Sequence, residues 1–216
     1  MANSINERTK QIFIANPNNP TGTLVTQEAI DRFMDRVPEN VIVVFDEAYY
    51  EFLDSPPDTL KFIREGRNVV VMRTFSKIQG LAGLRIGYGI TTPSLASVLQ
   101  KTRQPFNANL IAQEAALAAL DDEEHQNKTK LMTDEGRDLL QNEFEKMGIE
   151  FVPSFANFVL LRVGDGDAVF KEMLNKGVIV RAMSGYKLPE WIRVSIGTMK
   201  ENLRFLELLR SINSER

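Results

Sequence analysis

The sequence predicts an α/β fold, with a mostly parallel sheet that includes one antiparallel strand, followed by a small C-terminal α+β domain. Three short apolar runs come early in the chain: Gln11–Ala15, Val41–Phe45 and Val69–Met72. They are rich in β-branched residues and lack alternation, which is typical of strands buried on both faces of a parallel sheet. Helical patterns separate them, and mixed strands and helices return later. We therefore expect two domains, residues 1–130 and 131–216.

The connections between these runs support that topology. Thr26–Val37 begins with an N-cap candidate and carries apolar residues at helical spacing, so the first two runs form a βαβ unit. Leu60–Arg64 offers a shorter helical crossover to the third run. A fourth run, Ile86–Ile90, follows too closely for a parallel crossover, and we expect this strand to be antiparallel.

The middle of the chain is predicted to be helical. Helices are expected at Pro93–Thr102, Asn109–Leu120 and Asp121–Met147, with Gly148 as the natural stop of the third. The Ala-rich second helix is expected to be buried.

The C-terminal part returns to mixed structure. We expect strands at Phe158–Val163, Val178–Arg181 and Ile192–Ile196, and helices at Asp167–Asn175 and Lys200–Ile212.

The composition excludes several functional classes. The 216 residues are 43% hydrophobic and 25% charged, with a formal net charge of −3, so no basic excess indicates nucleic-acid binding. The absence of cysteine excludes a disulfide framework, a thiolate metal site and a cysteine nucleophile. No apolar run approaches the ~18 residues of a membrane span, so we expect a cytoplasmic protein without membrane contact. His125 and the turn at Asp165–Asp167 do not indicate a metal site.

Polar residues gather where the three predicted parallel strands end. The first strand leads into an Asn/Pro-rich segment, residues 16–22, the second ends on Asp46 with Tyr49 after it, and the third leads into Ser76 and Lys77. Each feature alone has an ordinary explanation as a turn or a cap. Ligands of open α/β sheets bind at this edge, so together these residues indicate one site.

The residue types suggest a chemistry for that site. The amine of Lys77 can form a Schiff base with an aldehyde cofactor, and Asp46 can be the acidic partner of a pyridine nitrogen. Ser76 and Arg85 lie on either side of the lysine in the sequence and suit a cofactor phosphate, which requires hydrogen-bond donors and positive charge.

At this point four motifs resemble a known family. Asn-Pro-Thr-Gly at 19–22, Asp-Glu-Ala-Tyr at 46–49, Ser-Lys at 76–77 and Gly-Leu-Arg-Ile-Gly at 83–87 are similar, in order and spacing, to the signature of the class I/II pyridoxal-phosphate aminotransferases of fold type I. The resemblance covers essentially the whole chain.

Two later stretches refine the resemblance. Residues 154–158 and 191–198 are most similar to the histidinol-phosphate aminotransferases within that family. The implied reaction is amino transfer between L-histidinol phosphate and 2-oxoglutarate, a step of histidine biosynthesis. Three alternatives stay open: an aminotransferase of aromatic or other amino acids, a pyridoxal-phosphate decarboxylase on the same scaffold, and a non-catalytic truncated remnant.

The resemblance also implies roles for single residues. Lys77 would bind the cofactor covalently and shuttle a proton, and Asp46 would keep the pyridine nitrogen protonated. Donors to the cofactor's ring oxygen would be Tyr49 and Asn19, and Ser76 and Arg85 would hold its phosphate. Substrate-binding residues would be Arg193, which pairs with a carboxylate, together with Arg181 and Asn157.

Family members carry a large segment before the position where this sequence starts. That segment supplies sheet strands, part of the phosphate site and a tyrosine that reaches the neighbouring subunit of a homodimer. We therefore expect this chain alone to bind pyridoxal phosphate weakly and to show little or no turnover. Open apolar faces would favour association with another chain.

Overall fold

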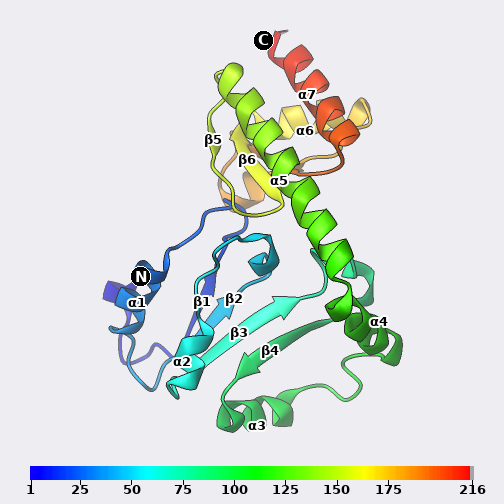
Figure 1. Ribbon diagram of the computed structural model, residues 1–216. Helices are drawn as coiled ribbons and strands as arrows, with labels where there is room; N and C mark the ends of the chain where they lie inside the picture. Colours follow the sequence, from blue (N-terminus) through cyan, green and yellow to red (C-terminus); the bar gives the residue numbers. More distant parts are fainter. Residues whose placement is uncertain (215–216) are drawn as a thin grey trace. The chain divides into compact units, whose positions relative to one another are not determined.

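The computed structural model describes residues 1–214 and divides the chain into two compact units (Figure 1). The first unit holds residues 1–17 and 24–126, and the second holds residues 18–23 and the chain from residue 127 onward. The border falls within helix α5 (Glu123–Lys146). The second unit thus includes a six-residue segment that the sequence prediction placed in the first domain.

The first unit contains a four-stranded sheet in the order β1-β2-β3-β4. Its strands are β1 (Gln11–Ala15), β2 (Ile42–Asp46), β3 (Val69–Thr74) and β4 (Gly87–Thr91). The first three are parallel, and β4 pairs with β3 in antiparallel orientation. The predicted topology, including the antiparallel fourth strand, is confirmed.

Helices α1 (Gln27–Met34) and α2 (Leu60–Arg64) pack on one face of this sheet. The core between them includes Ile30, Phe45, Phe62 and Val71, all nearly inaccessible to solvent. Alternate strand residues point to this face because side chains in a strand alternate. Thr26 caps α1 as predicted, since its side-chain oxygen accepts a hydrogen bond from the amide of Ala29 at 3.4 Å.

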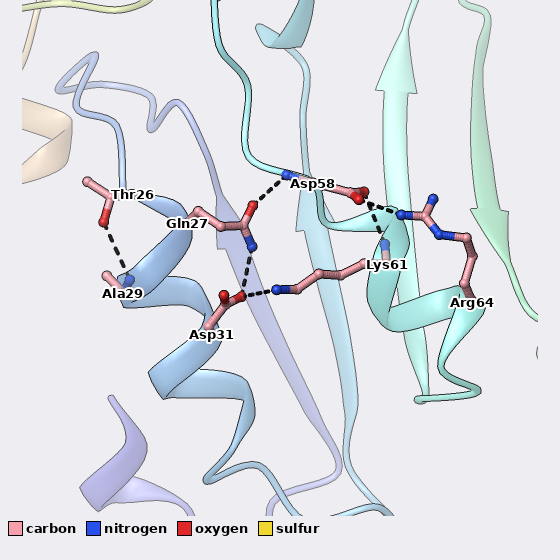
Figure 2. A network of polar contacts seen from close by, with 7 residues as sticks. All are labelled: Thr26, Gln27, Ala29, Asp31, Asp58, Lys61 and Arg64. Carbon is pink, nitrogen blue, oxygen red and sulfur yellow. Dashed lines mark hydrogen bonds and ion pairs between the residues drawn. The ribbon is translucent and has the colours of Figure 1, made fainter.

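A polar network connects the two covering helices (Figure 2). Asp31 on α1 accepts hydrogen bonds from Gln27 at 2.7 Å and from Lys61 on α2 at 2.6 Å. The amide of Asp58 donates to Gln27 at 2.6 Å, and the Asp58 carboxylate pairs with Arg64. These contacts fix the segment that enters α2 against α1.

The opposite face of the sheet is only partly covered. On it, Val44 and Val70 are buried. Phe13 is 63% exposed, so burial of the first strand on both faces was a wrong prediction, and Met72 is 36% exposed. The physical reason is that α1 and α2 cover only the face that carries Ile12 and Ile14, and β1 lies at the edge of the sheet. Strand β2 is better covered, with Val43, Val44 and Phe45 all buried.

The next helices are α3 (Pro93–Thr102) and α4 (Leu110–Asp121), with Asn109 as the N-cap of α4. The prediction that this second helix is buried is wrong, because Ala112 and Ala116 alone are buried along it. Leu110 is 70% exposed and Ile111 is 73% exposed. Apolar composition on nearly every side of a helix predicts burial, but only one side of α4 finds partners in its own unit.

The second unit packs helices against an antiparallel sheet with the order β5-β6-β8-β7. After α5 come β5 (Phe151–Val152), β6 (Phe158–Arg162), α6 (Gly166–Asn175), β7 (Arg181–Ala182), β8 (Trp191–Ser195) and α7 (Met199–Ser214). Short 3₁₀ turns occur at Ala2–Ser4, Tyr50–Phe52, Ala82–Leu84 and Ser184–Tyr186. The core includes Leu140, Phe144, Leu161, Ile192 and Leu206. It is separate from the core of the first unit.

One strand of this unit was predicted wrongly. Of the range Val178–Arg181, only Arg181 belongs to a strand, because the amide of Val178 donates to the carbonyl of Met173 at 2.9 Å and closes the end of α6. Gly148, in contrast, takes the predicted stop position after α5, with a φ of +65°.

Candidate active site

The segments that follow β2 and β3 bring two predicted site residues of the first unit, Tyr49 and Lys77, together. Asp46 ends β2 and is paired in register with Met72 of β3. The chain then leaves β3 and reaches Lys77, whose Nζ lies 5.1 Å from the ring centroid of Tyr49. Tyr49 is only 5% exposed, so its ring forms a fixed wall beside the amine.

Backbone hydrogen bonds hold the three strand ends in register. The carbonyl of Asp46 accepts from the amide of Asn16 at 3.0 Å, and the amide of Glu47 donates to the carbonyl of Met72 at 2.9 Å. The Asp46 carboxylate accepts from the amide of Ala48 at 3.2 Å. Asp46 is thereby placed at the edge of the sheet at which α/β proteins bind ligands.

The loop after β3 is also ordered by local contacts. Thr74 accepts a hydrogen bond from the amide of Ser76 at 3.1 Å, and the carbonyl of Lys77 accepts from Gly80 at 2.9 Å. Arg85 is exposed, takes a left-handed conformation with a φ of +54°, and donates to the carbonyl of Ala82 at 2.8 Å. Ser76, Lys77 and Arg85 therefore belong to one short turn-rich segment of the first unit.

A buried carboxylate and its partly buried arginine partner beside this site were missed by the sequence reasoning. Glu47 is 3% exposed, and its carboxylate pairs with the Arg73 guanidinium at 2.9 Å. Burial is the largest influence on the pKa of Glu47 and raises it, although the hydrogen bond from Thr59 and the charge of Arg73 act in the opposite direction. In the sequence, Glu47 is a motif residue without an assigned role, and Arg73 lies outside the motifs.

His125, which nothing in the sequence marks as a site residue, lies near the lysine. Its ring Nε2 lies 3.1 Å from the carbonyl oxygen of Ile78, the residue that follows Lys77. The 47 positions that separate the two residues leave no sequence signal for this contact. His125 therefore lies beside the lysine loop, a contact that the sequence did not reveal.

In the second unit, the structure brings Arg193 and Asn19 together, and the guanidinium of Arg193 donates to the side-chain oxygen of Asn19. The same guanidinium lies 5.0 Å from the ring centroid of Phe158. Arg193 on β8 is directly opposite Arg181 on β7, so two guanidinium-bearing positions are adjacent on this sheet.

A cavity of about 600 Å³ adjoins these arginines. Its lining includes Arg181, Arg193, Ser184, Tyr186 and Ser195. These side chains supply positive charge and hydroxyl donors, which suit an anionic group. Asn157 does not line this cavity. It is half-buried, and its carbonyl accepts a hydrogen bond from the amide of Ile196 at 2.9 Å.

Two of the recognised motifs meet in the second unit. Gly22 of the Asn-Pro-Thr-Gly motif accepts a backbone hydrogen bond from Phe155 at 2.8 Å. A side chain at Gly22 would begin only 2.3 Å from the hydroxyl of Ser154, and its φ is +75°, so the position requires glycine. This contact places the two motifs side by side in the second unit.

The family model described as aminotransferase class I and II matches residues 1–209. The chain belongs to this aminotransferase family. Among curated relatives, the histidinol-phosphate aminotransferase of Akkermansia muciniphila is 58% identical over 209 residues, which cover 97% of this chain and 58% of the relative. The family resemblance noted in the sequence is therefore confirmed.

Solved structures of family members share the fold. The histidinol-phosphate aminotransferase of Clostridium acetobutylicum matches with a TM-score of 0.89 and 26% identity, over 96% of this chain and 65% of that one. The enzyme of the same name from Sinorhizobium meliloti, solved in complex with pyridoxal-5′-phosphate, matches with a TM-score of 0.83 and 31% identity, over 94% of this chain and 58% of that one. The predicted α/β fold class is confirmed.

The chain spans about three fifths of the length of the curated relatives it matches. Across residues 1–214, none of the helices is both long and apolar enough to cross a membrane.

Proposed function

We propose that this aminotransferase-family chain carries the cofactor-binding and substrate-binding residues for amino transfer between L-histidinol phosphate and 2-oxoglutarate, with pyridoxal phosphate as cofactor. The observation that carries the proposal is the placement of the Lys77 amine beside the Tyr49 ring, next to the strand end that bears Asp46. A primary amine, an acid and a phenol within one rigid strand-end cluster fit the donor set that pyridoxal phosphate requires.

When bound, the cofactor supplies an electron sink for the bonds of the substrate carbon. The amine of Lys77 would hold the cofactor and would move a proton to and from the substrate. Asp46 would face the ring nitrogen as its acidic partner, and the phenol of Tyr49 would donate to the ring oxygen. Ser76 and Arg85 offer a hydroxyl and a guanidinium to the phosphate.

Asn19 is proposed as a second donor to the ring oxygen through its side-chain amide. Its side-chain oxygen accepts from Arg193, which leaves the amide hydrogens as the donating end.

The cavity of the second unit supports the substrate assignment. Arg181 and Arg193 face each other across neighbouring strands and would neutralise the phosphate and the carboxylate of the two substrates. Asn157 is proposed to fix the substrate from the loop before β6. The relative named histidinol-phosphate aminotransferase with 58% identity favours this substrate over an aromatic amino acid.

We propose in addition that residues 1–130 and 131–216 act as a large and a small domain of a cytoplasmic homodimer. The family resemblance supports the dimer, and exposed apolar side chains such as Ile111 and Phe13 offer surface for association.

Covalent trapping tests the proposal. The chain is incubated with pyridoxal phosphate, reduced with borohydride, and the labelled lysines are mapped by peptide mass spectrometry. We expect Lys77 to be labelled far above exposed Lys200, and Lys77→Ala to lose this label without a change in the label at Lys200. Equal labelling of both lysines in the unsubstituted chain would contradict the proposal.

A further inference from the structure

We propose that Glu47 and Arg73 are positioning residues that set the spacing between Asp46 and Lys77. The inference rests on the function proposed above, because it concerns how the cofactor-binding residues are held. Neither side chain has to touch the cofactor for this role. The pair spans the two strand ends from which the cofactor-binding residues emerge.

The geometry of the pair supports this role. Arg73 directs two nitrogens to the same Glu47 oxygen, Nε at 3.0 Å and Nη2 at 2.9 Å. The side chains are 13% and 4% exposed, respectively, so solvent competes little for either charge. Glu47 directly follows Asp46 at the end of β2, and Arg73 is the penultimate residue of β3, four positions before Lys77. The ion pair therefore links these two segments by their side chains, in addition to the backbone ladder.

Further contacts restrict both partners. The second oxygen of Glu47 accepts a hydrogen bond from buried Thr59, the neighbour of Asp58 in the network of Figure 2. The Arg73 guanidinium stacks 3.4 Å from the ring centroid of Tyr50, the residue after Tyr49. Each charged group is thus held on two sides, and its planar geometry leaves it few alternative positions.

A parallel link ties the lysine loop itself to the segment after β2. Burial raises the pKa of Glu51, and the side chain of Gln79, two residues beyond Lys77, acts on it in the opposite direction. Gln79 is buried, and one oxygen each of Gln79 and Glu51 has no hydrogen-bond partner within residues 1–214. Gln79 of the lysine loop thus acts on the segment after β2, to which the Glu47–Arg73 pair also ties the end of β3.

Stability alone is a weak reason for such an arrangement. Replacing a buried ion pair by apolar or neutral groups is often neutral or stabilising, whereas removing one partner is strongly destabilising. A misplacement of about 1 Å at a reacting group can reduce its reactivity on the order of 100-fold. Uncharged residues in place of Glu47 and Arg73 could match the stability of the ion pair, but they would lose the precise placement of the Lys77 amine.

The test compares variants by borohydride trapping of pyridoxal phosphate. The double variant Glu47→Gln with Arg73→Met removes both charges and should fold, since no charge is left buried without a partner. We expect its ratio of label at Lys77 to label at Lys200 to fall about tenfold. The single variant Arg73→Lys keeps both charges of the pair but loses the two-nitrogen contact, so it should recover part of the ratio.

Arg67→Met is the matched control. Arg67 donates to the carbonyls of Met34 at 3.0 Å and Val37 at 2.9 Å, near the start of β3 and away from Lys77. It should lower the melting temperature of the first unit but leave the labelling ratio unchanged.

Two outcomes overturn the inference, and they are distinguishable. A folded double variant that keeps the ratio of the unsubstituted chain would refute positioning by the pair and leave the proposed function intact. An unsubstituted chain without preference for Lys77 would refute the proposed function, and the inference would fail with it. If the double variant does not fold, Arg73→Lys decides in the same way, because it disturbs the geometry of the pair without leaving a charge unpartnered.

Discussion

Substitution of Gly22 by alanine tests the contact between two motifs of the second unit. The new methyl group would lie 2.3 Å from the hydroxyl oxygen and 2.8 Å from the Cβ of Ser154. Overpacking of this kind costs about 1–3 kcal/mol. The φ of +75° adds about 1–2 kcal/mol for any residue with a Cβ atom. We therefore expect Gly22→Ala to reduce the free energy of unfolding of the second unit by roughly 2–5 kcal/mol.

The chain provides its own probe for this measurement. Its single tryptophan, Trp191, lies on β8 of the second unit, so its fluorescence reports the unfolding of that unit. A loss of about 3 kcal/mol would lower the melting temperature by about 12–24 °C in a unit of this size. Gly148→Ala is the matched control, because Gly148 has a φ of +65° but no atom within 4 Å of the added methyl group.

The control should show only the backbone cost of about 1–2 kcal/mol. Adding Ser154→Gly to Gly22→Ala should recover part of the loss, since it removes the clashing side chain at the cost of one hydrogen bond to the amide of Ala156. A Gly22→Ala variant no less stable than Gly148→Ala would refute the reasoning.

Three further predictions concern stability. Leu161→Ala should cost about 2–5 kcal/mol in the Trp191 melt, because Leu161 is fully buried, and a cost below 1 kcal/mol would contradict this. Burial raises the pKa of Glu51 above 4.5, so the free energy of unfolding should fall as the pH rises through the range above 4.5. Glu51→Gln should weaken this dependence of the free energy of unfolding on pH, as measured by urea titrations. Hydrogen bonds from Lys61 and Gln27 lower the pKa of Asp31 below 3.8. The stabilisation from these bonds is therefore present above pH 3.8 and is lost as the pH falls through the pKa of the folded state. Asp31→Asn should remove this loss of the free energy of unfolding in acid.

Local rules predicted much of the secondary structure correctly. The bounds of α2 and α3 agree with the sequence prediction. Pro93 marks the start of α3, and the short-range spacing of apolar residues that forms a helix can be read directly from the sequence. The antiparallel orientation of β4 followed from the short connection to β3. These features depend on neighbours in the chain, and neighbours are what a single sequence displays.

Predictions that depended on distant partners were less successful. The composition of α4 predicted burial, but whether Leu110 and Ile111 are covered depends on elements elsewhere in the chain. The pairing of Glu47 with Arg73 joins positions 26 apart, and neither residue type indicates a partner. The cofactor and substrate roles of the motif residues stay predictions until the labelling experiment is made.

The hydrogen bond between Asn19 and Arg193 joins residues 174 positions apart, which has a consequence for synthesis. A ribosome adds about 5–20 residues per second, so the segment 18–23 waits roughly 10–30 s for its partners to emerge. Contacts of such long sequence separation also slow folding. Until β8 is made, this loop segment lacks its native neighbours, and translation pauses before Arg193 would extend its exposure to chaperones and proteases.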